Sequence, residues 1–149
     1  MANYTDSIGF NKGAAAFPAD VNSVSKFEVV LDFAAINAAR TAAGAAALAA
    51  ADTLQVINLP ANAVVLTAGI EVVTTDTSTA TFDLGFTGGS PAAANVYAND
   101  APISTAGYTV ADLANPTAVK VADTIDLLIN TAAPTTGKIR VFAVVADVS

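Results

Sequence analysis

The sequence lacks cysteine, histidine and tryptophan, and it contains a single methionine. Without cysteine no disulfide can form, and without cysteine and histidine the usual zinc, haem and iron–sulfur sites lose their ligands. The Ser-His-Asp and Cys-His arrangements of nucleophilic catalysis are excluded for the same reason. An enzyme with this composition would have to use carboxylates, lysine, tyrosine or a hard metal ion.

Positive charge is also scarce. The 149 residues include 6 Lys and Arg against 13 Asp and Glu, which gives a net charge of -7. A nucleic-acid binder needs a cationic surface to displace phosphate counterions, so this class is disfavoured. No basic residue occurs between Arg40 and Lys120, and this stretch carries -6 of the net charge. The asymmetry predicts a protein that docks by a neutral side and shows an acidic side to solvent.

Long apolar runs are absent. The longest uncharged stretch, residues 53–70, contains Gln55, Asn58 and Pro60, so it does not indicate a membrane-spanning helix. The first residues, MANYTDSIGFNK, have neither a cationic start nor an apolar run, and no secretory signal is predicted. We expect no membrane partner and a protein that stays in the cytoplasm where it is made.

What the sequence has in abundance is alanine, threonine and valine, with 35 Ala and 17 each of Thr and Val. Its length is that of one ordinary domain. Residues 26–33 alternate between apolar and polar, which predicts a half-buried strand. Further strands are predicted at residues 53–58, 64–74, 79–86, 118–121, 124–130 and 138–148. We expect 64–74 and 79–86 to form a hairpin around a turn at 75–78.

These strands predict a mainly β fold, an antiparallel β-sandwich or jelly-roll-like single domain over residues 26–149. Residues 1–25 are expected to form an irregular N-terminal arm, because they are rich in glycine, proline and polar turn residues. The Ala-rich segment 34–51 predicts a long connection with one or two helical turns, since Gly44 interrupts it. Residues 87–116 are expected to be loop-dominated, with a short element around 107–113.

Strands 64–74 and 138–148 carry apolar residues on both faces. In a two-layer sandwich the outer face usually meets water. We therefore expect loops, the arm or another subunit to cover these outer faces, and we favour neighbouring subunits.

No catalytic, cofactor-binding or metal-ligating residue is assigned. Asp123 and Asp126, with Asp112 nearby, offer oxygen ligands for calcium, but their spacing matches no EF-hand, and Asp126 is expected on the solvent face of a strand. The glycine-rich segment 85–90 lacks the P-loop lysine and is expected to be a turn. Carboxylate pairs for glycoside hydrolysis are unaccompanied by an aromatic cluster that would stack on sugars.

Tyr97 and Tyr108 lie in the predicted loop region. An exposed tyrosine can anchor a protein or a glycan. The simpler interpretation is that both rings pack the loop onto the sheet.

Four segments in order carry a resemblance to a known class of proteins. They are FEVVLDFAAINAAR at 27–40, DTLQVINLPANAVVLTAGIEVVT at 52–74, ATFDLGFTGG at 80–89 and GKIRVFAVVADVS at 137–149. Their order resembles that of small virion structural proteins of tailed bacteriophages. The resemblance implies a non-enzymatic capsid decoration or cement protein that stabilises the assembled head. It implies the major capsid protein and further copies of the chain as partners, as in a trimer or a higher ring, and a place in the virion.

Two other functions stay open. The chain would be a tail or fibre module if the 87–116 loops bound a receptor or a glycan. It would be a small hydrolase if two carboxylates shared a cleft and one had a raised pKa. In the decoration hypothesis, residues 1–25 are expected to act as a strap that becomes ordered on docking.

Overall fold

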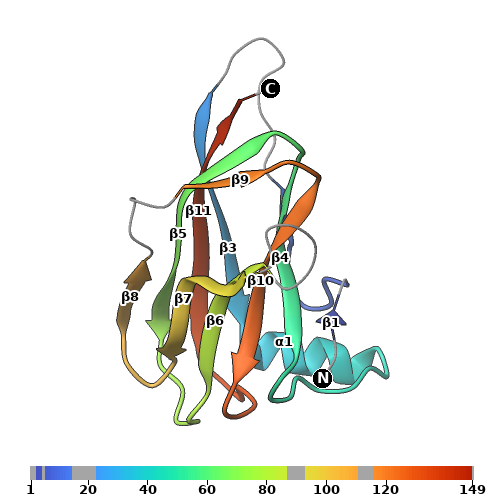
Figure 1. Cartoon of the computed structure of the whole chain (residues 1–149). Coiled ribbons are helices and arrows are strands. Elements are labelled where there is room, and N and C mark those ends of the chain that lie inside the picture. Colours follow the sequence, from blue (N-terminus) through green and yellow to red (C-terminus); the bar gives the residue numbers. More distant parts are fainter. Residues whose placement is uncertain (1–2, 5, 15–22, 87–92, 111–115, 149) are drawn as a thin grey trace.

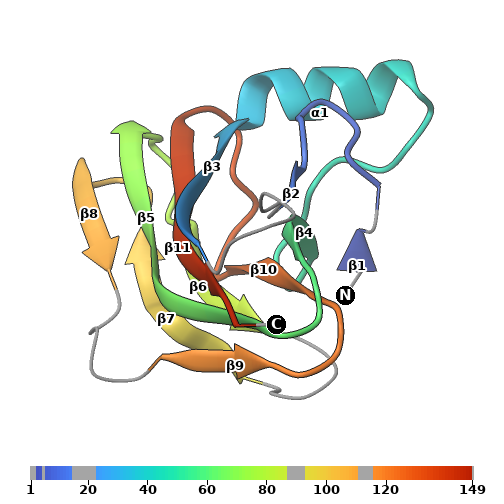
Figure 2. The ribbon, with the colours of Figure 1, turned by 90° about the horizontal axis from the view of Figure 1, so that it is seen from above.

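The computed structural model describes residues 3–4, 6–14, 23–86, 93–110 and 116–148. Within these residues the chain forms two facing β-sheets, and one helix lies at the lower end of the molecule in Figure 1. The two layers are separate when the molecule is seen from above (Figure 2). The predicted mainly β sandwich is confirmed.

The five-stranded sheet is antiparallel throughout. Its order is β3 (Val24–Asp32), β11 (Lys138–Asp147), β5 (Ala63–Thr74) and β8 (Gly107–Val110), and β9 (Thr117–Val119) pairs with the beginning of β5. The strand β11 lies at the centre and pairs along its length with both β3 and β5. Side chains alternate along it, with Ile139, Val141, Ala143 and Val145 fully buried between the sheets.

The six-stranded sheet contains both short N-terminal strands. Its order is β1 (Asn3–Tyr4), β4 (Thr53–Leu59), β10 (Asp123–Asn130), β6 (Thr81–Phe86) and β7 (Ala93–Pro102). The strand β2 (Gly13–Ala14) also pairs with β4, and both β1 and β2 run parallel to it. The other pairings in this sheet are antiparallel.

The helix α1 (Phe33–Ala42) follows β3 directly and takes up the first half of the Ala-rich segment. The Asp32 side chain accepts a hydrogen bond from the backbone N–H of Ala35 at 3.1 Å and caps the helix. Phe33, Ile36 and Arg40 form its buried face. Gly44, with φ +69°, ends it in the left-handed conformation typical of this position. The helix is longer than the expected one or two turns because its cap and its buried face both stabilise it.

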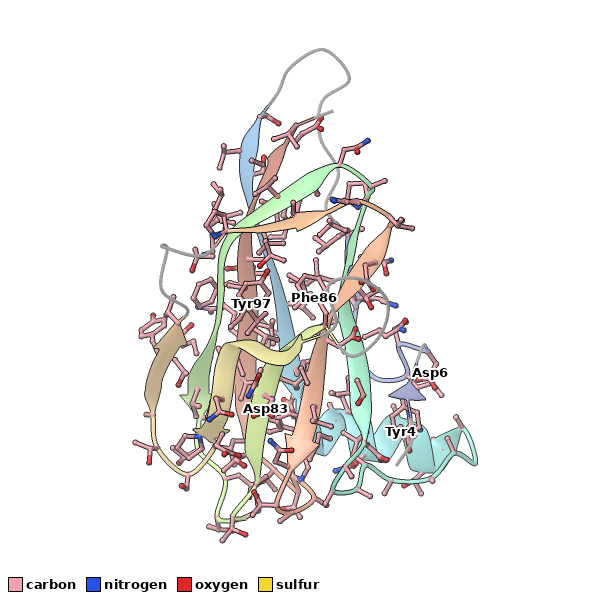
Figure 3. All side chains as sticks on the ribbon, viewed as in Figure 1. Tyr4, Asp6, Asp83, Phe86 and Tyr97 are labelled. Carbon is pink, nitrogen blue, oxygen red and sulfur yellow. The ribbon has the colours of Figure 1, made fainter. Side chains whose placement is uncertain are left out.

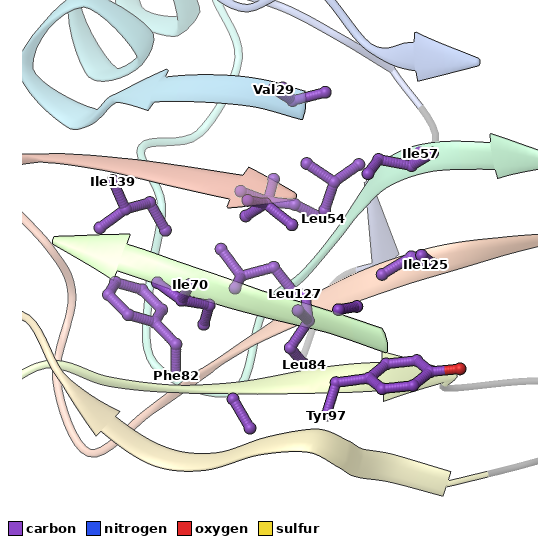
Figure 4. Close-up of a cluster of buried hydrophobic side chains, with 14 of the residues drawn as sticks. Val29, Leu54, Ile57, Ile70, Phe82, Leu84, Tyr97, Ile125, Leu127 and Ile139 are labelled. Atoms are coloured by element: carbon purple, nitrogen blue, oxygen red, sulfur yellow. The ribbon is translucent and has the colours of Figure 1, made fainter. Parts of the chain in front are cut away.

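The core lies between the sheets and is almost entirely aliphatic and aromatic (Figure 4). Phe33 of α1 stacks on Phe82 of β6, with ring centroids 5.3 Å apart. Phe86 and Tyr97 meet edge to face at 5.8 Å. The stack of Phe33 on Phe82 therefore joins the helix to the six-stranded sheet, and no local sequence pattern indicates this contact.

The predicted hairpin of 64–74 with 79–86 is wrong. The strand β5 belongs to the five-stranded sheet and β6 to the six-stranded sheet, so the connection between them crosses from one layer to the other. Buried Asp76 holds this crossing. Its carboxylate accepts hydrogen bonds from the backbone N–H groups of Ser78, Thr135 and Thr136, at 2.8–3.0 Å.

The expectation of a loop-dominated segment at 87–116 is wrong for residues 93–102, where β7 pairs with β6. The short element expected around 107–113 is present as β8, which pairs with β5, and residues 87–92 and 111–115 lie outside the described part. The pairing of β7 with β6 contains two register shifts. These irregularities and the run of Ala, Asn and Asp remove the period-two pattern that marks a strand.

The N-terminal arm packs on the same chain wherever it is described. The buried guanidinium of Arg40 lies 3.8 Å from the centre of the Tyr4 ring and 3.1 Å from the carboxylate of Asp6. Tyr4 and Asp6 are labelled in Figure 3. A Cβ at Gly9 would lie 2.6 Å from Cα of Ile36, and one at Gly13 would lie 2.7 Å from the Val29 side chain. Only glycine permits this close approach of the arm to α1 and β3.

Candidate functional site

The outer face of the five-stranded sheet is the best candidate for a functional surface. The strand register aligns its side chains in rows that run across the sheet. One row is Val30, Arg140, Glu71 and Tyr108, and the next is Glu28, Phe142, Gly69 and Val110. The outer face comprises the residues whose side chains point away from the core: Val24, Lys26, Glu28, Val30, Asp32, Val64, Thr67, Gly69, Glu71, Tyr108, Val110, Lys138, Arg140, Phe142, Val144 and Ala146.

The charges of the outer face neutralise one another. Arg140 forms an ion pair with Glu71, and its Nε lies 4.0 Å from Glu28. Lys26 pairs with Glu28 at 3.0 Å, and Lys138 with Asp32 at 3.2 Å. Three basic and three acidic side chains thus leave no net charge on this face.

Two ionisable groups on the outer face report these contacts. The hydrogen bond from Lys26 lowers the pKa of the Glu28 carboxyl below its ordinary value. The Tyr108 hydroxyl donates a hydrogen bond to Glu71 at 2.9 Å, and this bond raises the pKa of the tyrosine. Both shifts are consequences of these contacts, which require the ionised carboxylate of Glu28 and the neutral hydroxyl of Tyr108.

The middle of the outer face is hollowed. A hollow of about 260 Å³ is lined by Lys26, Glu71, Tyr108, Arg140, Phe142 and Val144. A Cβ at Gly69 would lie 2.9 Å from Cζ of Phe142, so the ring lies against a residue that has no side chain. The hollow therefore has apolar residues, Phe142 and Val144, among a polar and charged rim.

Apolar side chains are concentrated on the same face. Among the described residues eight large hydrophobic side chains are exposed, and four of them belong to the outer face. These four are Val24, Val30, Tyr108 and Val110. Tyr108 has 68% of its surface exposed. Neighbouring apolar side chains on one face are typical of a surface that contacts another molecule.

The remaining described residues carry an excess of negative charge. Away from the outer face they contain three basic side chains, Lys12, Arg40 and Lys120, and eight Asp side chains, of which four, together with Arg40, are buried. The expected neutral side corresponds to the outer face, and the excess of acidic groups belongs to the remaining described residues. These two parts do not follow the division along the sequence, because Glu71, from the acidic stretch, lies on the neutral face.

The calcium hypothesis finds no support in the described residues. Asp126 is buried, not solvent-facing as expected, and it accepts a hydrogen bond from the Thr124 hydroxyl at 2.6 Å. Asp123 accepts one from the Thr124 backbone N–H at 2.8 Å. Asp112 lies outside the described residues. No group of three His, Cys, Asp or Glu among the described residues could hold a metal ion.

The two tyrosines of the predicted loop region differ in burial, and the glycine-rich segment 85–90 is described only at its beginning. Gly85 and Phe86 end β6, and residues 87–90 lie outside the described part. Tyr97 is buried against Phe86, and burial raises the pKa of its hydroxyl to about 12. Tyr108 is exposed on the outer face, so only Tyr108 is available to a partner.

The carboxyl groups with a clearly shifted pKa do not match the hydrolase hypothesis, because that hypothesis requires a raised pKa and theirs are lowered. Burial alone would raise the pKa of Asp76, but the backbone hydrogen bonds from Ser78, Thr136 and Thr135 hold it well below its ordinary value. The pKa of Asp32 is lowered by its hydrogen bond from the backbone of Ala35. Asp83 and Asp100 lie close together, but Asp83 accepts the backbone N–H of Asp100 at 2.8 Å and orders β7. These carboxylates stabilise the fold.

The row that joins Glu71, Tyr108 and Arg140 was missed in the sequence. These residues are far apart along the chain, and only the pairing of β5 with β8 and β11 brings them together. The one available signal was the apolar character of both faces in β5 and β11. The described residues contain no helix with the length and apolar character needed to cross a membrane.

No protein-family model and no curated protein matches the chain. Solved structures do match. A chain in the capsid asymmetric unit of cyanophage Pam1 has a TM-score of 0.62 and 22% identity, with 96% of this chain and 97% of that chain covered. A chain in the acidic stable capsid structure of Helicobacter pylori bacteriophage KHP30 has a TM-score of 0.59 and 16% identity, with 87% and 92% covered. A chain in the capsid of Ralstonia phage GP4 has a TM-score of 0.54 and 18% identity, with 93% and 92% covered.

The likeness extends over nearly the whole of each chain. Because the aligned part covers similar shares of both partners, the three matched chains have about the same length as this one. The chain therefore shares its fold with small chains found in phage capsid structures. The resemblance to small phage virion proteins is confirmed at the level of the fold.

Proposed function

We propose that the protein is a structural component of a phage virion and that it decorates the assembled head. The observation that carries this proposal is the shared fold, which matches three chains in capsid structures over almost their full length. The four segments at 27–40, 52–74, 80–89 and 137–149 support the same class from the sequence.

Decoration is favoured over a wall-forming role by the distribution of charge and apolar surface. A wall subunit contacts neighbours on all its sides. Here the outer face has no net charge and carries four of the eight exposed large hydrophobic side chains of the described residues, and the remaining described residues have an excess of acidic groups. A molecule of this kind fits attachment by one side to a shell that another protein builds.

The proposed mechanism is stabilisation by mass action. A protein that binds only the assembled shell stabilises the shell by RT ln(1 + [L]/Kd), about 2.7 kcal/mol per site at 100 times Kd. The partners would be the major capsid protein and further copies of the chain around one shell site. The described part of residues 1–25 already packs on this chain, so as a strap the arm would add contacts to the shell without first becoming ordered. No catalytic group or cofactor takes part.

The test is the copy number of the protein in purified particles, measured by quantitative mass spectrometry against the major capsid protein. A ratio near one, or a simple fraction of one, is expected for decoration of the head. A ratio far below that would assign the chain to a tail or fibre. Absence from the particles would overturn the virion proposal.

A further inference from the structure

We propose that the outer face is the surface by which the protein docks on the capsid shell, with the hollow beside Tyr108 as the socket for one apolar side chain of the shell protein. The inference rests on the proposed function and adds to it the contact surface and the chemistry of the partner. It is carried by three observations that coincide on this face.

The first observation is charge. The outer face is neutral, whereas the described remainder has eight acidic and three basic side chains, four of the acidic and one of the basic groups being buried. Copies that are packed densely on one shell repel each other through their net charge of -7. This repulsion is smallest when the acidic surface points to solvent and the neutral face points to the shell.

The second observation is shape. The hollow of about 260 Å³ is smaller than the usual pocket for a drug-sized ligand. The hollow has an apolar centre, formed by Phe142 and Val144, and a charged rim, formed by Lys26, Arg140 and Glu71. An apolar centre with a polar rim is typical of protein interfaces. One apolar side chain fits such a socket better than a metabolite or a glycan.

The third observation decides between the shell and a second copy. A permanent homodimer interface has a continuous apolar centre and few charges. On the outer face, three ion pairs alternate with the exposed valines, so the face is stable in water before it docks. The net charge also opposes self-association of free copies. The occupant is therefore the shell protein, and its docking segment is apolar with little net charge.

The experiment compares binding of purified protein to empty heads that were assembled without it. Tyr108→Ala removes one wall of the socket, and Val110→Glu adds a charge to the outer face. Val121→Glu is the matched control, because Val121 is also exposed, at 72%, but lies outside the outer face. Co-sedimentation gives the apparent Kd, and circular dichroism verifies that each variant is folded.

We expect Tyr108→Ala and Val110→Glu to weaken binding about tenfold or more, and Val121→Glu to leave it within about twofold. If Val110→Glu does not fold, Val30→Glu tests the same face from β3, where Val30 is 44% exposed. Equal binding by all variants would overturn the docking face and leave decoration intact. If the wild-type protein failed to bind heads, decoration and its docking face would both be wrong.

The oligomeric state tests the choice of occupant. Sedimentation equilibrium of the free wild-type protein is expected to give a monomer. A dimer that Val110→Glu abolishes and Val121→Glu preserves would overturn the shell as occupant and assign the face to a second copy.

Discussion

Asp76 shows how one buried side chain determines a connection between layers. Its carboxylate accepts three backbone hydrogen bonds and contacts the hydroxyls of Thr135 and Thr136, so it joins the connection after β5 to the one before β11. Hydrogen bonds to a charged acceptor contribute more than neutral ones. The crossing between the two sheets depends on this single carboxylate.

Asp76→Asn is expected to lower the free energy of unfolding at pH 7 by about 2–3 kcal/mol, because an amide has only one acceptor oxygen for these donors. The folded-state pKa of Asp76 lies below its unfolded value. Its contribution is therefore full above the unfolded pKa near 4 and is lost as the pH falls towards the folded pKa. Urea unfolding at pH 7, 5 and 3 should show the difference between wild type and variant narrowing with acid.

Asp123→Asn is the control for this experiment, since within the described part of the chain Asp123 accepts a hydrogen bond only from the backbone N–H of Thr124. Its effect on stability is expected to stay within about 0.5 kcal/mol. A difference for Asp76→Asn that did not change with pH would contradict the ionised role of Asp76.

Gly9 determines how closely the arm approaches the helix. Gly9→Ala would place a Cβ 2.6 Å from Cα of Ile36 at a φ of +85°. Gly44→Ala is the matched control, because its φ is +69° and no atom lies within 4 Å of the new Cβ. We expect about 1 kcal/mol of destabilisation for Gly44→Ala from backbone strain alone, and at least about 2 kcal/mol for Gly9→Ala. Equal losses in thermal unfolding would show that the arm does not pack tightly at Gly9.

The strands with a clear alternation or a sustained apolar run could be predicted from the sequence. Residues 26–33, 124–130 and 138–148 correspond closely to β3, β10 and β11. The strand β7 could not be predicted from the sequence, because its side chains are mostly small or polar and its pairing with β6 contains register shifts. Propensity and periodicity describe a strand that faces a core, and β7 has few such residues.

The pairing of strands could be predicted even less. A turn-rich segment between two strands favours a hairpin, but the 75–80 connection joins two layers because Asp76 bonds to residues almost sixty positions away. The outer face could not be predicted for the same reason, because it also depends on contacts between distant parts of the chain. Its central row unites residues from β3, β5, β8 and β11, and register is a property of the whole sheet.

Truncation tests the role of the N-terminal arm as an element. We expect removal of residues 1–22, before β3, to preserve a single cooperative melt, because both sheets retain their central strands. The melting temperature should fall by about 5–15 °C, since Arg40 loses Tyr4 and Asp6 and the edge of β4 becomes exposed. Binding to heads should weaken if the arm is also a strap.

A milder change serves as the control for the truncation. Tyr4→Leu keeps an apolar contact on the Arg40 side chain but removes the cation–π interaction and the hydrogen bond between the Tyr4 hydroxyl and Asp52, so its effect should be limited to about 0.5–2 kcal/mol. Loss of the cooperative transition in the truncated protein would mean that the arm belongs to the folding unit of the sandwich.

At the scale of the whole molecule, the separation of charge is the property that connects fold to assembly. The five-stranded sheet gathers three of the six basic residues on one face and pairs each with a carboxylate. The same strands bury their other faces in the core. One sheet thus supplies part of the core and the neutral outer face, and this leaves the excess of acidic side chains to the rest of the described residues.

This separation predicts how salt affects docking. If the neutral outer face meets the shell, few charges are neutralised on binding, and the main electrostatic effect is repulsion between neighbouring acidic copies. The Debye length falls from about 30 Å at 0.01 M salt to about 10 Å at 0.1 M, so added salt screens this repulsion. Saturation of empty heads, measured by co-sedimentation between 0.01 and 0.2 M NaCl, should therefore become easier or stay constant. Docking through the acidic surface onto a basic shell would give the opposite result, a steep loss of binding with salt, because attraction between opposite charges would then be screened.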